Sequence, residues 1–374
     1  MARQETAALR RGWTTGACAA AAARAAFSAL LTGHFPDPVA IRLPRGQTPE
    51  FPLALAEQSQ GRARAGIVKD AGDDPDVTHG ALIIAELGWA APGSGILFRA
   101  GEGVGTVTRP GLALAIGEPA INPAPRAMIC ETLADLAEAN GAPSPDLVVT
   151  IAIPDGERLA EKTMNARLGI VGGLSVLGTT GIVVPYSCSS WIHAIQRGID
   201  VARAAGFAHI AAATGSTSER AVQRLYDLPE AALIDMGDFV GGTLKYLRRH
   251  PVPRLTLAGG FAKMAKLAQG HLDLHSSRSR LDTAALANML AGRGADPATV
   301  AAASEADQGR QELAPRPRSY SNPCYGSPPW NPAPISLTST SRPKRCTTKG
   351  CSSASASSRA RRARSSGSRA GARY

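Results

Sequence analysis

The stretch His209–Tyr226, HIAAATGSTSERAVQRLY, shows the local pattern that decides the fold: a short apolar strand, a Thr-Gly turn and an amphipathic helix. The same order returns at Ala232–Ile234 with Phe239–Arg249. It returns once more at Arg254–Ala258 with Phe261–Gln269. Repeated strand–helix units predict a mostly parallel sheet with helices on both faces, and such sheets bind ligands beyond the carboxyl ends of their strands.

Upstream of this stretch the pattern changes. Ser190–Ala205 is expected to be a helix with Trp191, Ile195, Ile199 and Ala202 on one face. Leu147–Ile153 is an apolar run that we expect to be the first strand of the parallel sheet. Before it, short strands and a few helices are typical of an α+β layer structure. The elements predicted there are Ala17–Leu31, Val39–Leu43, Ala65–Lys69, Gly95–Phe98 and Met128–Asn140. Thr14 or Thr15 is expected to cap the first helix, and Gly33 to end it.

The sequence therefore predicts two domains and a tail. Residues 1–146 form an N-terminal α+β domain, and residues 147–307 form a Rossmann-like α/β domain with a following helical segment. The tail, residues 308–374, has no apolar periodicity and is expected to be disordered.

The tail also carries the excess charge. From Pro315 to Tyr374 it holds twelve Lys/Arg, no Asp/Glu, fourteen serines and eight prolines. The rest has 41 − 12 = 29 basic and 30 acidic residues, so its net charge is −1 and the total of +11 does not indicate nucleic-acid binding by the body. A sequence without acidic residues and of this composition resembles the out-of-frame translation of a GC-rich gene. A genuine basic tail is the alternative.

Two apolar segments imitate membrane signals. Arg10 and Arg11 precede Ala17–Leu31 as in a twin-arginine export signal, but Arg24 interrupts the apolar run, so we expect an alanine-rich helix. The second, Leu168–Tyr186, holds five glycines and a proline, which favour loops near a ligand over a membrane span. The six cysteines form no CxxC pair, so neither a disulfide framework nor a zinc site is predicted, and a cytoplasmic location is expected.

Glycine, hydroxyl and acidic side chains follow the predicted parallel strands. Amides freed by glycine suit carboxylates, and an acidic side chain at a strand end can hold ribose hydroxyls, so these segments suit an adenosyl-type ligand. Ser216 and Glu219 also have capping-box spacing. In residues 165–181, NARLGIVGGLSVLGTTG, tight packing of small residues is the alternative. The candidate cofactor-binding residues are Gly172, Gly173, Thr179, Thr180, Thr214, Gly215, Ser216, Asp235, Gly237, Asp238, Gly259 and Gly260.

Charged loops are candidates for binding a second ligand, the substrate. Residues 69–80, KDAGDDPDVTHG, crowd four aspartates into one turn. A substrate-binding or structural polar loop, a divalent-cation site and a plain turn are the alternatives there. GEGVGTVTRPG at residues 101–111 is weak as a phosphate loop, because Pro110 prevents a following helix. The candidate substrate-binding residues are Asp70, Asp73, Asp74, His79, Arg109, Arg126, Lys263, His275, Arg278 and Arg280; no nucleophile signature occurs, so no catalytic residue is named.

Taken in order over about residues 9–307, these segments resemble the CbiD family, the cobalt-precorrin-5B C1-methyltransferases of anaerobic-type cobalamin biosynthesis. The resemblance rests on RRGWTTGACAAAAA, KDAGDDPDVTHG, GEGVGTVTRPGL, GEPAINPAPR, NARLGIVGGLSVLGTTGIV, TGSTSE, DMGDFVG and GGFAKMAKLAQGHLDLHSSRSRLD. Trp13 stands where the family often has Tyr. Nothing after Asp307 resembles the family's C-terminal helical region, so reduced stability is expected.

The resemblance implies a cofactor and a substrate. The cofactor is S-adenosylmethionine, and its methyl group goes to C1 of cobalt-precorrin-5B to give cobalt-precorrin-6A; the family does not by itself assign residues to either. The implied partner is a cobalt-containing corrinoid precursor, with no nucleic acid and no membrane, and homo-oligomerisation stays open. A non-catalytic tetrapyrrole-binding or carrier protein of the same pathway is the alternative.

Overall fold

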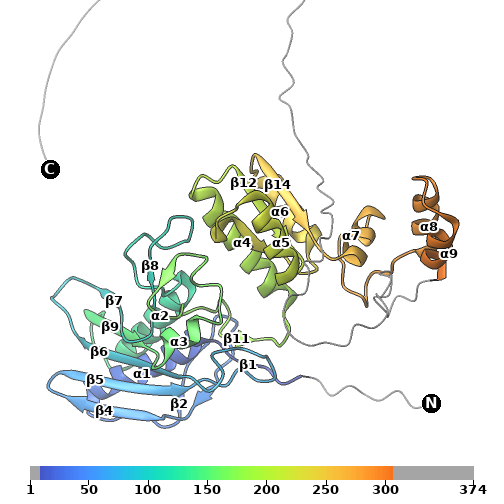
Figure 1. The fold of residues 1–374 in the computed structure, drawn as a ribbon. Helices are drawn as coiled ribbons and strands as arrows, with labels where there is room; N and C mark the ends of the chain where they lie inside the picture. The colour runs from blue at the N-terminus through green and yellow to red at the C-terminus, as the bar shows by residue number, and fades with distance from the viewer. Residues whose placement is uncertain (1–8, 306–374) are drawn as a thin grey trace, which may run out of the picture. The chain divides into compact units, whose positions relative to one another are not determined.

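The computed structural model describes residues 9–305, which contain a mixed sheet, a parallel sheet and the helices packed on them (Figure 1). The mixed sheet has five strands in the order β4-β5-β6-β9-β7. Neighbouring strands are antiparallel except β7, which runs parallel to β9. The strands are β4 Leu55–Ser59, β5 Arg62–Val68, β6 Leu82–Trp89, β9 Leu147–Ala152 and β7 Ile96–Ala100.

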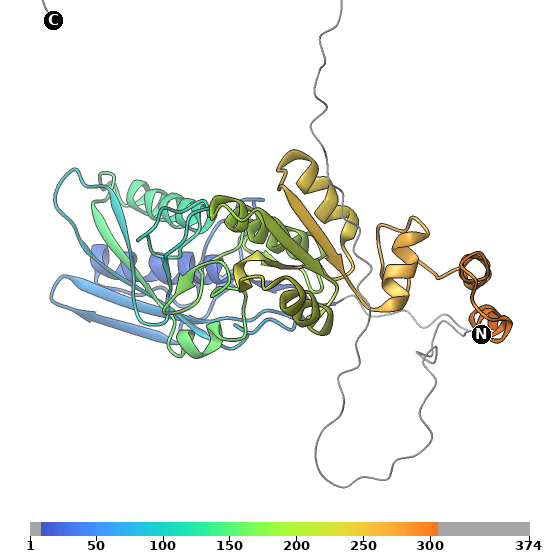
Figure 2. The ribbon, with the colours of Figure 1, turned by 45° about the horizontal axis from the view of Figure 1, so that its top comes forward.

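The alanine-rich helix α1, Thr15–Thr32, lies along β5 and β6 in both views (Figures 1 and 2) and also contacts α2, Pro123–Ala139. As predicted, Thr14 caps it, with Oγ1 accepting from the amide of Ala17 at 3.2 Å, and Gly33 ends it at φ +80°. Within residues 9–305, α1 is the one helix long and apolar enough to cross a membrane, yet 72% of it is buried inside the protein. Its apolar character is explained by packing against the sheet and α2.

The expectation that Leu147–Ile153 begins the parallel sheet is wrong. Strand β9 pairs with β6 and β7 in the mixed sheet. Its side chains alternate, with Leu147, Val149 and Ile151 buried and the residues between them half-exposed. Such alternation is typical of a sheet covered on one face, whereas a central parallel strand is apolar on both faces. The division into two domains at residue 147 stays a prediction.

The parallel sheet has three strands in the order β13-β12-β14. Strands β12, His209–Ala213, and β14, Arg254–Ala258, have the predicted bounds, and β13, Leu233–Asp235, begins one residue late. The chain moves from β12 to β13 and then back past β12 to β14, so right-handed crossovers place α5 and α6 on opposite faces. The helices here are α4 Cys188–Ala204, α5 Ser216–Tyr226 and α6 Val240–Arg249.

Short elements complete the described chain. Three antiparallel pairs of two-residue strands join loops: β1 Gly12–Trp13 with β11 Ile182–Val183, β2 Val39–Ala40 with β3 Glu50–Phe51, and β8 Thr106–Val107 with β10 Ile170–Val171. The remaining helices are α3 Gly156–Ala160, η1 Glu230–Ala232, α7 Phe261–Ala268, α8 Thr283–Ala291 and α9 Pro297–Glu305. The predicted tail, residues 308–374, lies outside the described residues.

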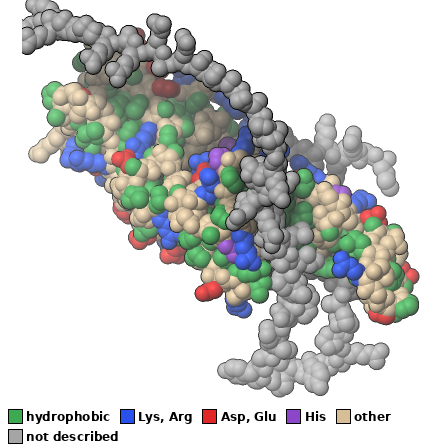
Figure 3. Space-filling model, turned by 90° about the horizontal axis from the view of Figure 1, so that it is seen from above, with side chains coloured by type: hydrophobic (Ala, Val, Ile, Leu, Met, Phe, Trp, Pro, Cys, Tyr) green, Lys and Arg blue, Asp and Glu red, His purple; other side chains and the backbone are tan. Residues whose placement is uncertain are grey.

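Figure 3 shows how charged side chains are distributed on one face of the described residues. On the face drawn in Figure 3, Lys/Arg and Asp/Glu side chains are interspersed and neither kind dominates. This distribution agrees with the near-neutral charge of the chain before Pro315.

Candidate functional site

The three parallel strands end side by side. Asp235 and Ala258 are both in register with Ala213, the last residue of the central strand. The amide of Thr214 donates to the Ala258 carbonyl at 2.9 Å, and the amide of Met236 donates to the Ala213 carbonyl at 3.0 Å. The loops that follow β12, β13 and β14 therefore leave the sheet at one edge, which we call the carboxyl edge. It brings together the predicted residues Thr214, Gly215, Ser216, Asp235, Gly237, Asp238, Gly259 and Gly260.

Two glycines at this edge face open space. Gly215 and Gly260 are the N-cap residues of α5 and α7, with φ of 165° and −62°, which other residues also adopt. A Cβ placed on either one would meet no atom of residues 9–305 within 4 Å, immediate neighbours aside. Neither backbone strain nor packing within the described chain requires glycine here. The space is available to a ligand that approaches the backbone closely.

The neighbouring glycines are constrained by the protein itself. A Cβ on Gly259 would lie 3.0 Å from Met264 Sδ and from Thr214 Oγ1. Gly237 has φ +52°, a left-handed conformation that favours glycine. These two glycines shape the edge, whereas Gly215 and Gly260 leave room at it.

The predicted capping box at α5 is wrong. Ser216 lies inside the helix, Gly215 is its N-cap, and no side chain caps its first turn. The Glu219 carboxylate instead accepts two hydrogen bonds from Arg167, at 2.7 and 2.8 Å, and the same guanidinium donates to Glu230 at 3.0 Å. The first amides of α5 are thus left without a side-chain acceptor, and such amides bind anions.

Charged side chains line the carboxyl edge. Burial and the nearby Glu219 carboxylate raise the pKa of Asp235, while the Gly237 amide, Arg167 and Lys263 act against this rise. Lys263 Nζ lies 2.9 Å from Asp238 Oδ1 and 3.4 Å from the Thr214 carbonyl. The edge therefore offers two carboxylates and one ammonium group next to the open glycines.

The predicted segment 165–181 has a different setting. The strand that was expected to bring it to the parallel sheet belongs to the mixed sheet. A Cβ on Gly173 would lie 2.2 Å from the Gly103 carbonyl oxygen. At Gly173 the structure therefore favours the alternative interpretation of this segment, the tight packing of small residues. Thr180 Oγ1 accepts from the amide of Ile182 in its own loop at 3.3 Å. Gly172 and Thr179 are exposed. Cofactor binding by Gly172, Gly173, Thr179 and Thr180 stays a prediction.

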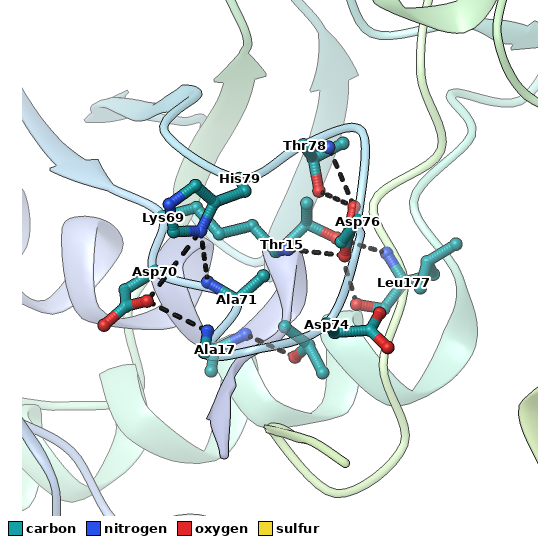
Figure 4. A network of polar contacts seen from close by, with 12 residues as sticks. Thr15, Ala17, Lys69, Asp70, Ala71, Asp74, Asp76, Thr78, His79 and Leu177 are labelled. Atoms are coloured by element: carbon teal, nitrogen blue, oxygen red, sulfur yellow. Dashed lines mark hydrogen bonds and ion pairs between the residues drawn. The ribbon is translucent and has the colours of Figure 1, made fainter. Parts of the chain in front are cut away.

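The aspartate-rich loop uses its acidic groups internally (Figure 4). Asp70 forms an ion pair with Arg10, which lowers the pKa of that carboxyl to about 2. Asp73 accepts from the Arg10 amide at 2.6 Å, and Asp74 accepts from the Tyr186 amide at 2.8 Å. His79 Nδ1 accepts from the amide of residue 71 at 3.1 Å. The predicted substrate residues here therefore tie three chain segments together.

Lys69, which the sequence reasoning passed over, is the buried centre of this loop. Its side chain is 1% exposed, and its Nζ lies 2.6 Å from Asp76 Oδ2. The other oxygen of Asp76 accepts from the amide and hydroxyl of Thr78, at 2.8 and 2.6 Å. Although burial alone would raise the pKa of Asp76, the Lys69 charge and these hydrogen bonds lower it. Within residues 9–305 no group of three His, Cys, Asp or Glu side chains is arranged to hold a metal ion.

The predicted anion-binding residues fall into two groups. Arg126 is engaged by the protein: it donates to Glu118 at 2.8 Å and lies over the Phe98 ring at 5.3 Å. Arg278 pairs with Asp273 at 3.2 Å, and His275 bonds Ser277, but both side chains are exposed. Arg109 and Arg280 are exposed and have no ion-pair partner within residues 9–305.

The loop that carries His275 lies beside the carboxyl edge. The amide of Leu274 donates to the Asp238 carbonyl at 3.1 Å, and the Leu272 carbonyl accepts from Gly241 at 2.8 Å. Arg109 has another position, lining a hollow of about 150 Å³ together with Arg167 and Glu230. Lys263, His275 and Arg278 are thus grouped near the edge by the fold, and Arg109 is not part of that group.

Comparison with known proteins gives the family. The family model CbiD matches residues 2–185. A cobalt-precorrin-5B C(1)-methyltransferase of Paramagnetospirillum magneticum is 63% identical over 306 residues, which are 82% of this chain and 85% of that protein. This chain belongs to the CbiD family. The protein of the same name from Methylorubrum extorquens is 66% identical over 285 residues, 76% of this chain and 79% of its own length. The resemblance described from the sequence is confirmed.

A crystal structure titled cobalamin biosynthesis protein (cbiD) from Archaeoglobus fulgidus is 29% identical in sequence to this CbiD member. The match covers 72% of this chain and 83% of that one, with a TM-score of 0.39.

Proposed function

We propose that this chain transfers the methyl group of S-adenosylmethionine to C1 of cobalt-precorrin-5B, giving cobalt-precorrin-6A. In this step the bond between sulfur and the methyl carbon breaks, and sulfur keeps the electron pair. A new carbon–carbon bond forms with an electron pair of the macrocycle, which takes up the positive charge of the sulfonium. The products are the C1-methylated corrinoid and S-adenosylhomocysteine.

The carboxyl edge of the parallel sheet is the feature that supports this proposal. Gly215 and Gly260 leave space beside the backbone, and the uncapped amides of α5 suit the carboxylate of the methionine part. Asp235 and Asp238 stand at a strand end, where acidic side chains hold ribose hydroxyls. Thr214 and Ser216 add hydroxyl groups. This donor set fits S-adenosylmethionine, whose role is to supply the electrophilic methyl group.

For the corrinoid, whose rim bears carboxylates, we propose the exposed basic side chains. His275, Arg278 and Arg280 follow the loop that is bonded to the carboxyl edge, and Lys263 lies at the edge itself. Arg109 is a further candidate at a different position. Arg126 is a poor candidate because its side chain is only 24% exposed, less than those of Lys263 and Arg278, and its guanidinium bonds Glu118 and two carbonyls. We assign Asp70, Asp73, Asp74 and His79 to holding the loops in place.

The deciding experiment is mass spectrometry of the corrinoid after incubation of the full chain with cobalt-precorrin-5B and S-adenosylmethionine. We expect a gain of one methyl group and an equal amount of S-adenosylhomocysteine. Gly215→Val should reduce product formation by at least about tenfold, because its side chain fills the open space. Gly292→Val is the control, since Gly292 also flanks a helix with a φ that other residues adopt, −64°, but it is the C-cap of α8 and lies away from the carboxyl edge.

The carrier hypothesis makes the opposite prediction. A non-catalytic tetrapyrrole-binding protein would bind the corrinoid, leave its mass unchanged and consume no S-adenosylmethionine. That result, obtained with a folded chain, would replace the proposed enzyme activity. A cytoplasmic location and a homo-oligomer stay predictions.

A further inference from the structure

Trp191 lies at the carboxyl edge, although its helix precedes the parallel sheet in the sequence. Helix α4 ends just before β12 begins, so it runs antiparallel to the strands and starts at their carboxyl ends. A direct contact supports this placement: Trp191 Nε1 donates to the Asp235 carbonyl at 3.3 Å. The periodicity of α4 predicted that Trp191 shares one face with Ile195 and Ile199, yet those two residues are buried and Trp191 is 48% exposed.

The indole ring of Trp191 packs against Gly237 and Phe239. A Cβ on Gly237 would lie 3.4 Å from three ring atoms, Cε2, Cζ2 and Nε1, so the ring rests against the backbone of this glycine. Phe239 packs nearby, with ring centroids 6.4 Å apart and planes at 45°. Gly237 and Phe239 thus cover part of the indole, while the residue as a whole stays 48% exposed. The hydrogen bond to the Asp235 carbonyl fixes the orientation of the exposed ring.

We infer that Trp191 is the stacking platform for the adenine ring of the S-adenosylmethionine bound at the carboxyl edge, an inference that rests on the proposed function. Adenine is bonded directly to ribose, and the ribose hydroxyls are assigned to the carboxylates at the end of β13. Trp191 contacts the last residue of that same strand. Aromatic rings stack on purine bases through their faces, and a ring already fixed in place loses little entropy on binding.

The chemistry of the ring also decides between the two ligands. The corrinoid is larger than one indole. It needs exposed cationic side chains that can bind the carboxylates along its rim. The contacts that hold the Trp191 ring are the backbone of Gly237, the Phe239 ring and the Asp235 carbonyl, none of which is a cation. The cation at this edge, Lys263, is paired with Asp238. An uncharged, purine-sized ring is therefore the better occupant.

The test is a titration of the full chain with S-adenosylhomocysteine, followed by calorimetry and by tryptophan fluorescence. We expect Trp191→Ala to weaken binding by at least about fivefold, the lower limit for a base stacked on an aromatic ring. Trp191→Ala should weaken the binding of adenosine, which lacks the amino-acid part, by the same factor. The fluorescence change of the wild type should disappear in Trp191→Phe, while Trp191→Phe keeps most of the affinity because a phenyl ring also stacks.

Trp89→Phe is the matched control, because Trp89 is similarly exposed, 53%, and lies at the end of β6 in the mixed sheet. It should keep both the affinity and the fluorescence change. Unchanged affinity of a folded Trp191→Ala chain for S-adenosylhomocysteine overturns the inference and leaves the proposed function intact. The same conclusion follows if Trp191→Ala alters only the KM for the corrinoid. A wild-type chain that does not bind S-adenosylhomocysteine overturns both.

Discussion

The aspartate-rich loop and the carboxyl edge of the parallel sheet are both rich in acids and glycines, but the protein uses them in opposite ways. In the loop, Asp70, Asp73, Asp74 and Asp76 all accept hydrogen bonds from the chain itself. At the carboxyl edge, Gly215 and Gly260 leave space unfilled and the first turn of α5 has no side-chain cap. A dense motif therefore does not by itself mark a ligand contact.

The environment of each glycine separates the two kinds of region. Gly12 and Gly72 lie where β1 and the aspartate-rich loop are in close contact. A Cβ added at these glycines would lie 2.0 and 2.2 Å from backbone atoms. Such positions require glycine for packing within the chain. Where a glycine has ordinary φ and open space around it, packing gives no reason for it, and a ligand becomes the better explanation.

Breaking the buried ion pair should give the largest effect. In Lys69→Met the Asp76 carboxylate, 25% exposed, loses the cation that compensates its burial. We expect the free energy of unfolding to fall by about 3 kcal/mol, as for other ion pairs from which one buried partner is removed. Urea denaturation followed by circular dichroism measures this loss.

The control for Lys69 is Arg42→Met, which removes an exposed ion pair with Asp135 and should cost less than about 1 kcal/mol. The double variant Lys69→Met/Asp76→Leu should regain part of the lost stability, since no unpaired charge remains. Equal losses for Lys69→Met and Arg42→Met would contradict a supporting role for the buried pair.

Replacing two adjacent glycines of the segment 165–181, Gly172 and Gly173, should lower the stability of the protein by different amounts. Gly173→Ala forces a methyl group against the Gly103 carbonyl, and we expect a loss of about 2–3 kcal/mol from overpacking. Gly172→Ala meets no described atom within 4 Å and carries only the cost of its φ of +83°, about 1 kcal/mol. Thermal unfolding of both variants checks the difference. If Gly172→Ala also abolishes binding of S-adenosylhomocysteine, the predicted cofactor role of this segment is supported.

A second adjacent pair should separate binding from folding at the carboxyl edge. Gly260→Ala should keep the melting temperature within a few degrees and weaken S-adenosylhomocysteine binding by about tenfold, about 1.4 kcal/mol. Gly259→Ala should instead lower stability, because its methyl group would crowd Met264 and Thr214. Calorimetric titration and thermal unfolding measure the two quantities. Full affinity in Gly260→Ala would remove this residue from the proposed cofactor site.

The smallest expected effect is a pH dependence at Arg10. The folded chain holds the pKa of Asp70 at about 2, below its usual value, so ionised Asp70 contributes stability above its unfolded pKa and loses it as the pH falls through about 2. Both side chains are largely exposed, so the contribution is small. Arg10→Ala should therefore lower the melting temperature slightly at pH 6 and progressively less toward pH 2. A gap that widens on acidification would contradict this assignment.

Local sequence rules predicted much of the fold. The strands at His209–Ala213 and Arg254–Ala258 follow from short apolar runs before glycine turns, and α1 follows from Thr14, the alanine run and Gly33. The sheet to which β9 belongs could not be read from its composition, because strand partners are distant in sequence. Its alternation of buried and half-exposed residues is seen in the structure, and in the sequence LVVTIA only Thr150 hints at it, because the other half-exposed positions are also apolar.

The candidate site was predicted only in part. The strand-end residues were found because parallel strands end together, which is a property of the topology. The Arg167–Glu219 pair was missed because the capping-box spacing predicted that Glu219 pairs with Ser216, three residues away. In the fold, Glu219 pairs with Arg167, which is 52 residues away in the sequence. Helical periodicity put Trp191 on one face with Ile195 and Ile199, but periodicity alone does not show how far each residue of that face is covered.

Helix α1 has a consequence for how the chain tolerates change. Its residues from Ala17 to Ala23, together with Ala25 and Ala26, are fully buried, so methyl groups and one thiol set the spacing between the mixed sheet and α2. Each extra methylene there must displace either the mixed sheet or α2. We expect this to lower the free energy of unfolding by about 1–3 kcal/mol. Saturation mutagenesis should therefore find this stretch as intolerant as a catalytic motif. Its restriction is steric, and substitution by serine or glycine should be accepted there more readily than substitution by valine or leucine.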